Sequence, residues 1–375
     1  MSSERKDQHV TLADAQHAEP PARNDFDDVR FMHHALAGID RDRVSLRTQF
    51  AGVSWRAPLY INGMTGGSAR TGEINRSLAI AARETGVAIA SGSMSMALRD
   101  PSTAGTFQVL REQNPDGFVM ANLSADARPD QAAHAIELVR ADALQLHLNS
   151  VQETVMPEGD RAFSAWPDAI AAIIDAVDVP VIVKEVGFGL SRATLEQLAD
   201  LGVTVADVSG SGGTDFARIE NSRRDGGDFG YMAGWGQSAV CCLLDGADAP
   251  AGSALPALLA SGGVRTPLDV VRALALGARA VGVSGVFLHA LLRDGQDALI
   301  ALIRTWLEQI AQLQALLGAV TVADLGDTDV LLRGSVREFC GLRGIDAAGY
   351  SRRSQRAGAR RAPRLPNASA GDDDD

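Results

Sequence analysis

Short apolar runs of strand length recur along the chain from residue 58 onward, and amphipathic segments separate them. Apolar strands that alternate with helices predict a parallel sheet buried on both faces. Eight such units within about 230 residues match the number and size expected of a (β/α)₈ TIM barrel, the α/β fold that we predict. The expected strands are 58–62, 87–91, 118–122, 143–147, 181–185, 205–209, 257–261 and 280–284, and expected helices between them include 73–84, 130–140, 167–176, 191–200 and 267–276.

A doubly wound open sheet is the alternative fold for the same alternation. Such sheets usually carry a G-x-G-x-x-G turn directly after their first strand. Here the first expected strand leads into Met64-Thr65-Gly66-Gly67-Ser68, which lacks that spacing. The barrel is therefore favoured.

The segments that flank the barrel differ from it in pattern. Residues 1–57 are polar, and we predict an irregular arm that ends in a hairpin, because 44–50 alternates like a strand and is followed by Gly52. The barrel with its closing helices then spans 58–346. Residues 347–375 are rich in Arg and end in four Asp, a composition typical of a disordered tail.

Two long segments interrupt the repeating pattern. Residues 210–236, after the sixth expected strand, form a connection long enough to be a functional lid or a disordered segment. Residues 294–317 predict one long amphipathic helix, and 321–325 and 330–332 are interpreted as further closing helices.

The composition narrows the class of protein. The chain has 375 residues, 46% of them hydrophobic, with 38 glycines, as suits an α/β enzyme with many tight turns. A net charge of −12 argues against a nucleic-acid binder, and it means that an anionic substrate needs local basic residues or a metal. Three cysteines without metal or disulfide spacing, no apolar N-terminal segment and no membrane-length apolar run predict a cytoplasmic protein.

Polar residues stand at the carboxyl ends of the expected strands, where α/β enzymes keep their chemistry. The segment from His147 to Glu153 offers an imidazole, carboxamides and a carboxylate. An ordinary polar loop would explain this segment alone, but all eight strand ends carry small or hydrogen-bonding residues. They are Asn62, Ser91, Asn122, His147, Lys184, Ser209, Ser261 and Ser284.

The last two strand ends suggest a phosphate site. Glycines let backbone N–H groups approach an anion, and the loops after strands seven and eight of a barrel often cradle a phosphate. Gly262-Gly263-Val264-Arg265 and Ser284-Gly285 therefore predict a phosphorylated cofactor. The alternative is a tight turn that caps the helix beginning near Thr266.

Lys184 closes an apolar strand, so its ammonium group should point into the barrel mouth. Flavin-binding barrels use such a lysine to stabilise the anionic reduced ring. A structural pair with Glu185 and a Schiff-base lysine are the alternatives, and the phosphate loops favour the flavin.

Taken together, these motifs resemble those of a known family. From Arg5 to about Asp346 it is similar to the type 2 isopentenyl diphosphate isomerases, FMN-dependent (β/α)₈ enzymes of isoprenoid synthesis. The motifs that carry the resemblance are Arg5-Lys6-x-x-His9, Met64-Thr65-Gly66-Gly67, Gly92-Ser93, Ala121-Asn122-Leu123, His147-Leu148-Asn149 with Gln152-Glu153, Val183-Lys184-Glu185-Val186-Gly187, Ser209-Gly210-x-Gly212-Gly213-Thr214, Trp235-Gly236, Ser261-Gly262-Gly263-Val264-Arg265 and Arg337-Glu338-Phe339-Cys340.

The resemblance implies roles for individual residues. From charge alone the stretch from Arg5 to His9 is typical of a solvated terminus, whereas the family pattern places it on the substrate. Glu153 would help to bind Mg²⁺. FMN would be held by Met64, Thr65, Gly66, Ser93, Asn122, Lys184 and Thr214, with its phosphate on Gly262, Gly263, Arg265, Ser284 and Gly285. Contacts to the diphosphate substrate are expected from Arg5, Lys6, His9, Ser93, Asn149 and Gln152.

The implied reaction is a 1,3-allylic proton shift between isopentenyl and dimethylallyl diphosphate. Reduced FMN would serve as acid and base, NADPH would only reduce the flavin, and His147 and Gln152 are the protein groups expected to assist. The resemblance also implies a homotetramer or homo-octamer. One departure from many relatives is Met94-Ser95-Met96, which could alter contacts near the diphosphate.

Three other functions fit part of the pattern. An α-hydroxy-acid oxidase needs a catalytic His near the sixth or seventh strand, and none follows His147 until His289. A nucleotide dehydrogenase needs a cysteine after the sixth strand, and 210–236 contains none. A non-catalytic flavin protein has no need for Arg5, Lys6, His9 or Glu153.

Overall fold

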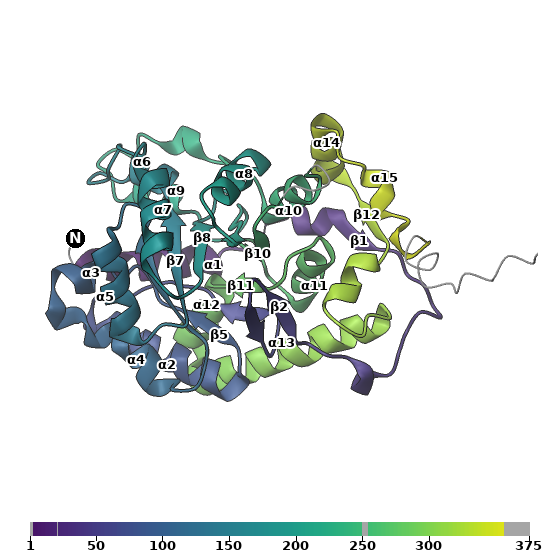
Figure 1. Ribbon diagram of the computed structural model, residues 1–375, viewed down its shortest axis with the longest axis horizontal. Helices are drawn as coiled ribbons and strands as arrows, with labels where there is room; N and C mark the ends of the chain where they lie inside the picture. Colours follow the sequence, from purple (N-terminus) through teal and green to yellow (C-terminus); the bar gives the residue numbers. More distant parts are fainter. Residues whose placement is uncertain (1–2, 21, 250–253, 356–375) are drawn as a thin grey trace, which may run out of the picture.

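A closed barrel of eight parallel strands forms the centre of the computed structural model, which describes residues 3–20, 22–249 and 254–355 (Figure 1). The predicted fold is confirmed, and each expected strand overlaps an observed one. The pairing of Val281 with Leu59 and of Val283 with Ile61 closes the barrel. The strands are β4 (Leu59–Ile61), β5 (Ala88–Ala90), β6 (Val119–Ser124), β7 (Ala143–Leu148), β8 (Val181–Glu185), β9 (Val205–Asp207), β10 (Ala257–Ser261) and β11 (Val281–Val283).

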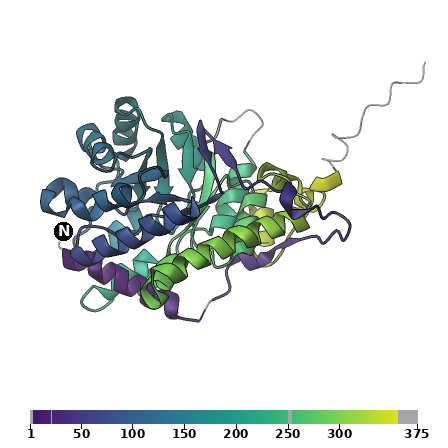
Figure 2. The same cartoon turned by 90° about the horizontal axis from the view of Figure 1, so that it is seen from below.

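Helices surround the barrel and bury its outer face. The longest is α13 (Gln296–Leu316), which runs along the outside next to α2 (Figure 2). Within the described ranges, no helix is both long and apolar enough to cross a membrane. The other helices of the ring are α2 (Ala69–Thr85), α4 (Gly105–Gln113), α5 (Pro129–Val139), α7 (Trp166–Ala176), α8 (Arg192–Asp200), α10 (Ala239–Ala247), α11 (Pro267–Ala275) and α12 (Gly285–Asp294).

A hairpin plugs the amino-terminal end of the barrel; the alternation in 44–50 predicted a hairpin but not its place in the fold. Its strands are β2 (Thr48–Phe50) and β3 (Val53–Trp55). The buried face of the hairpin packs against residues at the start of the barrel strands, among them Tyr60. The ring of Trp55 lies 5.0 Å from the Phe50 ring and 5.4 Å from the Tyr60 ring, measured between centroids.

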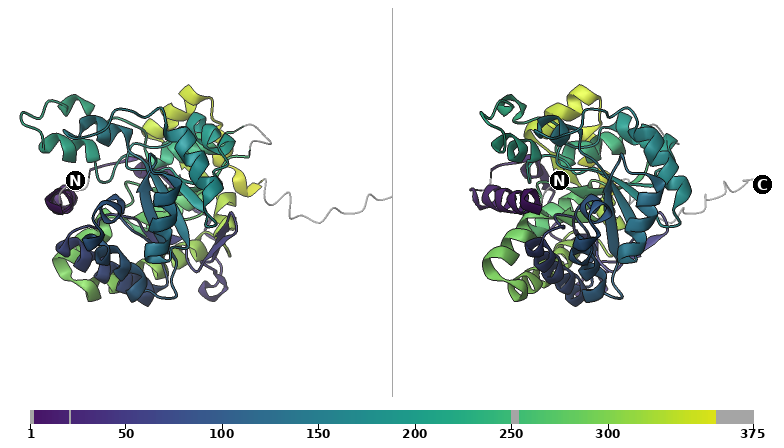
Figure 3. Two further views of the ribbon diagram at one scale, coloured as in Figure 1. Left: turned by 60° about the vertical axis from the view of Figure 1, so that its left-hand side comes forward. Right: turned by 90° about the vertical axis from the view of Figure 1, so that its left-hand side faces the viewer.

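The amino-terminal arm is not irregular, because it begins with helix α1 (Ser3–Ala18). The prediction of a solvated terminus is also wrong, since Arg5 and Lys6 are only 7% and 8% exposed. A broad apolar stripe is what usually marks a helix in sequence, and here only Val10 and Ala13 supply buried apolar surface. Helix α1 lies beside the carboxyl-terminal mouth of the barrel, in contact with α9 (Phe216–Ser222) and α12 (Figure 3).

The carboxyl-terminal segment differs from the prediction in several elements. Residues Val330–Leu332 form strand β12, which pairs antiparallel with β1 (Val29–Phe31), and not a closing helix. A three-residue strand whose partner lies so far away in sequence has no local signal. The expected helix 321–325 is a short 3₁₀ turn, η5 (Ala323–Asp327).

Two helices that were not predicted follow β12. They are α14 (Gly334–Arg343) and α15 (Ala347–Tyr350), so the first residues of the expected tail are helical. The backbone N–H of Ser354 still donates to Asp329 at 2.8 Å. The rest of the expected tail, from residue 356, lies outside the described residues.

The remaining short elements belong mostly to the connections at the barrel mouth. The long 210–236 segment contains α9 and a 3₁₀ turn, η4 (Gly230–Met232). The others are α3 (Ser95–Arg99), η3 (Pro101–Thr103), α6 (Ser150–Val155), η1 (Asp25–Asp28) and η2 (Arg41–Arg43).

Replacing Trp55 by Ala should destabilise the protein by about 3–5 kcal/mol, because the substitution removes a buried aromatic side chain from the hairpin plug. The free energy of unfolding in urea measures the effect. Leu36→Ala is the control, since Leu36 is also apolar and lies in the same amino-terminal segment but is 99% exposed. A loss below about 1 kcal/mol in Trp55→Ala would contradict the plug.

Candidate active site

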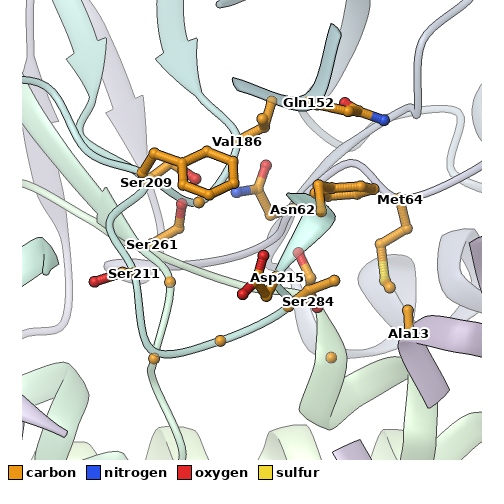
Figure 4. Close-up of a pocket in the computed structure, with 18 of the residues that line it drawn as sticks. Ala13, Asn62, Met64, Gln152, Val186, Ser209, Ser211, Asp215, Ser261 and Ser284 are labelled. Carbon is orange, nitrogen blue, oxygen red and sulfur yellow. The ribbon is translucent and has the colours of Figure 1, made fainter. Parts of the chain in front are cut away.

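A cavity of about 1420 Å³ opens at the carboxyl-terminal ends of the barrel strands. Figure 4 shows side chains from several strand ends, including Asn62, Ser209, Ser261 and Ser284, around this space. Helix α1 and the segment that contains α9 also contribute to its lining. The site therefore combines barrel strands with residues from the first turns of the chain.

The tertiary structure brings nearly all the predicted site residues to this cavity. Only Thr65 and Gly66 are absent from its lining. Those that line it are Arg5, Lys6, His9, Met64, Ser93, Asn122, His147, Asn149, Gln152, Glu153, Lys184, Thr214, Gly262, Gly263, Arg265, Ser284 and Gly285.

Thr65 and Gly66 support the cavity wall from behind. The backbone carbonyl of Thr65 accepts from Gly92 N at 3.2 Å and from Asn75 Nδ2 at 3.3 Å. A Cβ on Gly66 would lie 2.1 Å from the Phe107 ring, so only glycine fits. Direct FMN contacts from these two residues stay a prediction.

The departure at Met94-Ser95-Met96 does not put sulfur on the cavity wall. Met94 and Met96 are buried in the protein and are absent from the lining, whereas Ser95 faces the cavity. Ser95 Oγ lies 3.1 Å from Ser93 Oγ, so this part of the wall presents two hydroxyl groups.

Lys184 is buried at the end of β8, and its Nζ donates to the backbone carbonyl of Glu185 at 2.8 Å. Burial lowers the pKa of Lys184, and the carboxylates of Asp207 and Glu185 oppose this effect. The Glu185 carboxylate accepts backbone N–H groups of the following loop, including Val186 at 2.6 Å. The alternative of a side-chain pair between Lys184 and Glu185 is therefore not what the structure contains.

Asp207 is a buried carboxylate that the sequence interpretation missed. It lies beside Lys184 in the register of β8 and β9. Tyr60 Oη donates to it at 2.6 Å and Asn62 Nδ2 at 3.2 Å, and Ser261 Oγ donates at 2.9 Å. A carboxylate within an otherwise apolar strand was an available signal, because a buried charge needs partners. Asp207 provides negative charge beneath the cavity floor.

His147 is held in a neutral state at the cavity wall. Its Nδ1 lies 2.9 Å from Asn122 Oδ1, and Asn122 Nδ2 donates to Gln145 Oε1 at 3.1 Å. Burial, with Lys184 and Lys6 nearby, lowers the pKa of His147 to about 3. Because Asn122 Oδ1 can only accept, Nδ1 carries the proton and Nε2 is an acceptor. Near neutral pH His147 is therefore a neutral hydrogen-bonding group, and it is neither an imidazolium acid nor a strong base.

Helix α6 places Asn149, Gln152 and Glu153 on one side of the cavity. Asn149 Nδ2 donates to Glu153 Oε1 at 2.9 Å, while Asn149 Oδ1 is buried without a hydrogen-bond partner. Glu153 Oε2 accepts from Asp160 N at 2.9 Å. Across the described part of the chain, no group of three or more His, Cys, Asp or Glu residues could hold a metal. A cation bound by Glu153 would therefore depend on substrate and water oxygens, which suits Mg²⁺.

Three cationic side chains converge on the cavity near α1. Arg5 Nη1 lies 3.3 Å from Glu158 Oε1, and Arg5 Nε is buried without a partner. Lys6 makes no hydrogen bond or ion pair to residues in the described ranges, and burial together with Arg5 and Arg99 lowers its pKa to about 8. The sequence interpretation missed Arg99, which has no motif of its own. This cluster is suited to binding an anion.

Glu220, also missed from sequence, connects three elements of the site. Its Oε1 lies 3.0 Å from His9 Nε2 of α1 and accepts from Gln152 Nε2 of α6 at 2.9 Å, and Arg223 pairs with Oε2. Burial opposes the charge of Glu220, but these hydrogen bonds outweigh it and lower the pKa to about 2. The carboxylate thereby fixes the orientation of His9 and Gln152.

The two predicted phosphate loops differ in how open they are. Arg265 is paired with Asp27 at 2.7 Å and with Asp269 at 3.4 Å, and the Thr266 side chain caps α11. Helix α12 begins at Gly285, and its N-cap residue Ser284 makes no side-chain cap. The amino-terminal end of α12 is therefore the more open of the two predicted loops, since its first N–H groups lack side-chain acceptors.

Comparison with known proteins places the chain in a family. The model of the FMN-dependent dehydrogenase family matches residues 109–332. An isopentenyl-diphosphate delta-isomerase of Kitasatospora griseola is 64% identical over 96% of this chain and 97% of its own length. The enzyme of the same name from Streptomyces sp. (strain CL190) is 62% identical over 94% of this chain and 96% of its own length.

Solved structures share the fold at low sequence identity. A mandelate oxidase with a monooxide FMN adduct has a TM-score of 0.61 and 20% identity, covering 87% of this chain and 92% of that chain. A mandelate oxidase with benzaldehyde has a TM-score of 0.60 and 18% identity, covering 87% and 90%. This likeness concerns the barrel alone.

These observations define the chain first as an FMN-dependent TIM-barrel enzyme. The high sequence identity to isopentenyl-diphosphate delta-isomerases, over nearly their whole length, then narrows this class to one family. The chain belongs to the type 2, FMN-dependent isopentenyl-diphosphate delta-isomerases, so the predicted family is confirmed.

The stability of the protein in mild acid should depend on His147. Its folded-state pKa of about 3 lies below the unfolded value near 6.5, so the stabilisation present above pH 6.5 is lost as the pH falls toward 3. In His147→Gln, the free energy of unfolding should therefore fall less between pH 7 and pH 5, by about 1–2 kcal/mol, than in the unmodified protein. Urea unfolding at both pH values measures this difference. Equal losses in both proteins would contradict a neutral, buried His147.

Proposed function

We propose that this isomerase interconverts isopentenyl and dimethylallyl diphosphate by a 1,3-allylic proton shift with FMN and Mg²⁺ bound in the barrel cavity. The observation that carries the proposal is the cluster of Arg5, Lys6 and Arg99 beside the cavity. Lys6 is buried without a partner among the described residues, which is unfavourable for a cation, and a bound diphosphate would supply the missing negative charge. This local cluster would also overcome the overall charge of −12.

The cavity residues suit FMN at the barrel end of the site. Lys184 lies at the cavity floor with Asp207 beneath it, and the open amino-terminal end of α12 would take the phosphate. Met64, Ser93, Asn122 and Thr214 would hold the remainder of the cofactor. When bound and reduced, FMN supplies the acid and base chemistry at the reacting carbons.

The protein groups expected near the reacting carbons, His147 and Gln152, would mainly position the substrate. His147, as a neutral imidazole, would offer Nε2 as a hydrogen-bond acceptor. Gln152 is oriented by its hydrogen bond to Glu220 and would offer a fixed amide to the substrate. Helix α1 covers the mouth and would limit the entry of water, which competes for a cationic carbon.

Glu153 would bind Mg²⁺ together with oxygens of the diphosphate and water. Asn149 and the backbone N–H of Asp160 already hold the two carboxylate oxygens in place. A hard divalent cation that bridges one carboxylate and a diphosphate keeps several waters and needs few protein ligands.

The side chains that an α-hydroxy-acid oxidase or a nucleotide dehydrogenase would need do not support these two alternative functions. His289, the candidate for an oxidase histidine, lies on α12 and contacts Asp14 Oδ1 at 2.7 Å. Cys241, on α10, is buried, and burial raises the pKa of its thiol to about 12, so it is a poor nucleophile. These contacts fit structural roles.

Several expectations stay predictions. NADPH is the expected reductant of FMN, and a homotetramer or homo-octamer is the expected assembly. The net charge argues against a nucleic-acid partner, and the composition predicts the cytoplasm as the location.

An anaerobic assay with FMN, Mg²⁺, NADPH and isopentenyl diphosphate tests the proposed reaction. We expect dimethylallyl diphosphate to form only when the flavin is reduced, without stoichiometric consumption of NADPH. Glu153→Gln should bind FMN normally and should need a much higher Mg²⁺ concentration for activity. A folded, FMN-containing protein that forms no product under these conditions would contradict the proposal.

The KM for isopentenyl diphosphate should rise as the pH passes about 8, because Lys6 then loses the charge that attracts the diphosphate. The increase should approach tenfold per pH unit. Lys6→Arg should flatten this dependence up to about pH 9, since a guanidinium keeps its charge. The matched control is Arg99→Lys, which leaves Lys6 in place and should keep the dependence. An identical pH profile in Lys6→Arg would exclude Lys6 as its cause.

A further inference from the structure

The side chain of Gln16 clamps the backbone of a single residue across the barrel mouth. Gln16 lies near the end of α1, and its Nε2 donates to the carbonyl oxygen of Asp215 at 3.1 Å. Asp215 N donates in return to Gln16 Oε1 at 3.0 Å. One amide thus satisfies both backbone groups of Asp215, as a neighbouring strand would.

Asp215 lies between two parts of the active site. Thr214, directly before it, lines the cavity, and its Oγ1 is 3.6 Å from the position that a Cβ on Gly285 would take. The Asp215 side chain caps α9 by accepting from Arg218 N at 3.0 Å. Helix α9 carries Glu220, which contacts His9 and Gln152. Movement of Asp215 would therefore displace both the cofactor side and the substrate side of the site.

Helix α1 carries the expected diphosphate ligands on its first turns. Arg5, Lys6 and His9 precede Gln16 on one continuous helix, so an anchor at Gln16 fixes where these cations lie. Two ion pairs also lie near this end of the helix. Asp14 contacts His289 of α12 at 2.7 Å. Glu19 pairs with Arg218 of α9, and both of these side chains are at least half exposed. Exposed ion pairs contribute little. The Gln16 clamp, by contrast, holds the backbone of Asp215, the N-cap residue of α9, through two hydrogen bonds.

We propose that Gln16 is a positioning residue that couples the segment expected to hold FMN to the helix that carries the diphosphate-binding cations. Bound FMN would order Thr214 and Asp215 and, through Gln16, would stabilise the docked position of α1. The docked helix would in turn favour the binding of FMN. Such coupling is reciprocal by thermodynamic necessity. The identity of the two ligands rests on the proposed function, whereas the clamp itself does not.

Trypsin cleavage of the full-length protein after Arg5 and Lys6 measures the docking of α1. Both side chains are buried, so cleavage requires the helix to leave the barrel, and its rate follows the undocked population. Without FMN, Gln16→Ala should be cleaved roughly tenfold faster than the unmodified protein, because two hydrogen bonds are lost. Gln8→Ala is the matched control, since Gln8 is exposed on the same helix and accepts a long hydrogen bond of 3.4 Å from Arg223. Its cleavage rate should change less than twofold.

Addition of FMN then tests the coupling. FMN should slow cleavage in the unmodified protein and in Gln8→Ala, and it should give little protection in Gln16→Ala. By reciprocity, Gln16→Ala should bind FMN more weakly in a fluorescence titration. Gln16→Glu, which keeps the acceptor but loses the donor, should show the same changes and serves as a second variant if Gln16→Ala folds poorly.

Steady-state kinetics separates positioning from a general loss of folded protein. In Gln16→Ala with saturating FMN, the KM for isopentenyl diphosphate should rise severalfold while kcat changes less than twofold, whereas loss of folded enzyme lowers kcat at constant KM. Equal cleavage in Gln16→Ala and the unmodified protein, or equal protection by FMN, would overturn the coupling. An unmodified protein that binds no FMN would instead contradict the proposed function, and the FMN-free cleavage rates would still report on the clamp.

Discussion

Closure of the barrel through the pairing of β11 with β4 is the interaction on which the rest of the structure depends. Once the ring is closed, all eight carboxyl-terminal strand ends meet at one rim, and residues far apart in sequence share one cavity. Closure also leaves two open ends that have to be covered. The amino-terminal segment covers both, with the β2–β3 hairpin at the bottom and α1 at the mouth.

The same burial that builds the cavity sets the chemistry of its side chains. A low-dielectric environment disfavours charge, which keeps His147 neutral and lowers the pKa of Lys6 to about 8. Charges that persist there have partners, as Glu220 does with His9, Gln152 and Arg223. Lys6 departs from this rule, because it faces the cavity without a partner among the described residues, whereas Arg5 pairs with Glu158.

Helix α1 gives the site a component that is not part of the rigid barrel. It binds mainly through polar contacts to α9, α12 and α2 and buries little apolar surface. An element of this kind can dock and undock at modest cost. This property suits a cover that has to admit a diphosphate and then enclose it.

The sequence by itself determined the barrel, because its strands and helices carry strong local periodicity, and it identified the strand-end residues through family motifs. It did not reveal α1, whose docking face is polar, or β12, whose partner β1 lies at the other end of the chain. Tertiary structure alone decided the partners of buried charges such as Asp207 and Glu220, and it alone showed that Arg265 is already paired with Asp27. The periodicity of a helix or strand is written in its own residues, so the sequence reveals it. The contacts of Asp207, Glu220 and Arg265 depend instead on how the closed ring brings residues from distant parts of the chain together.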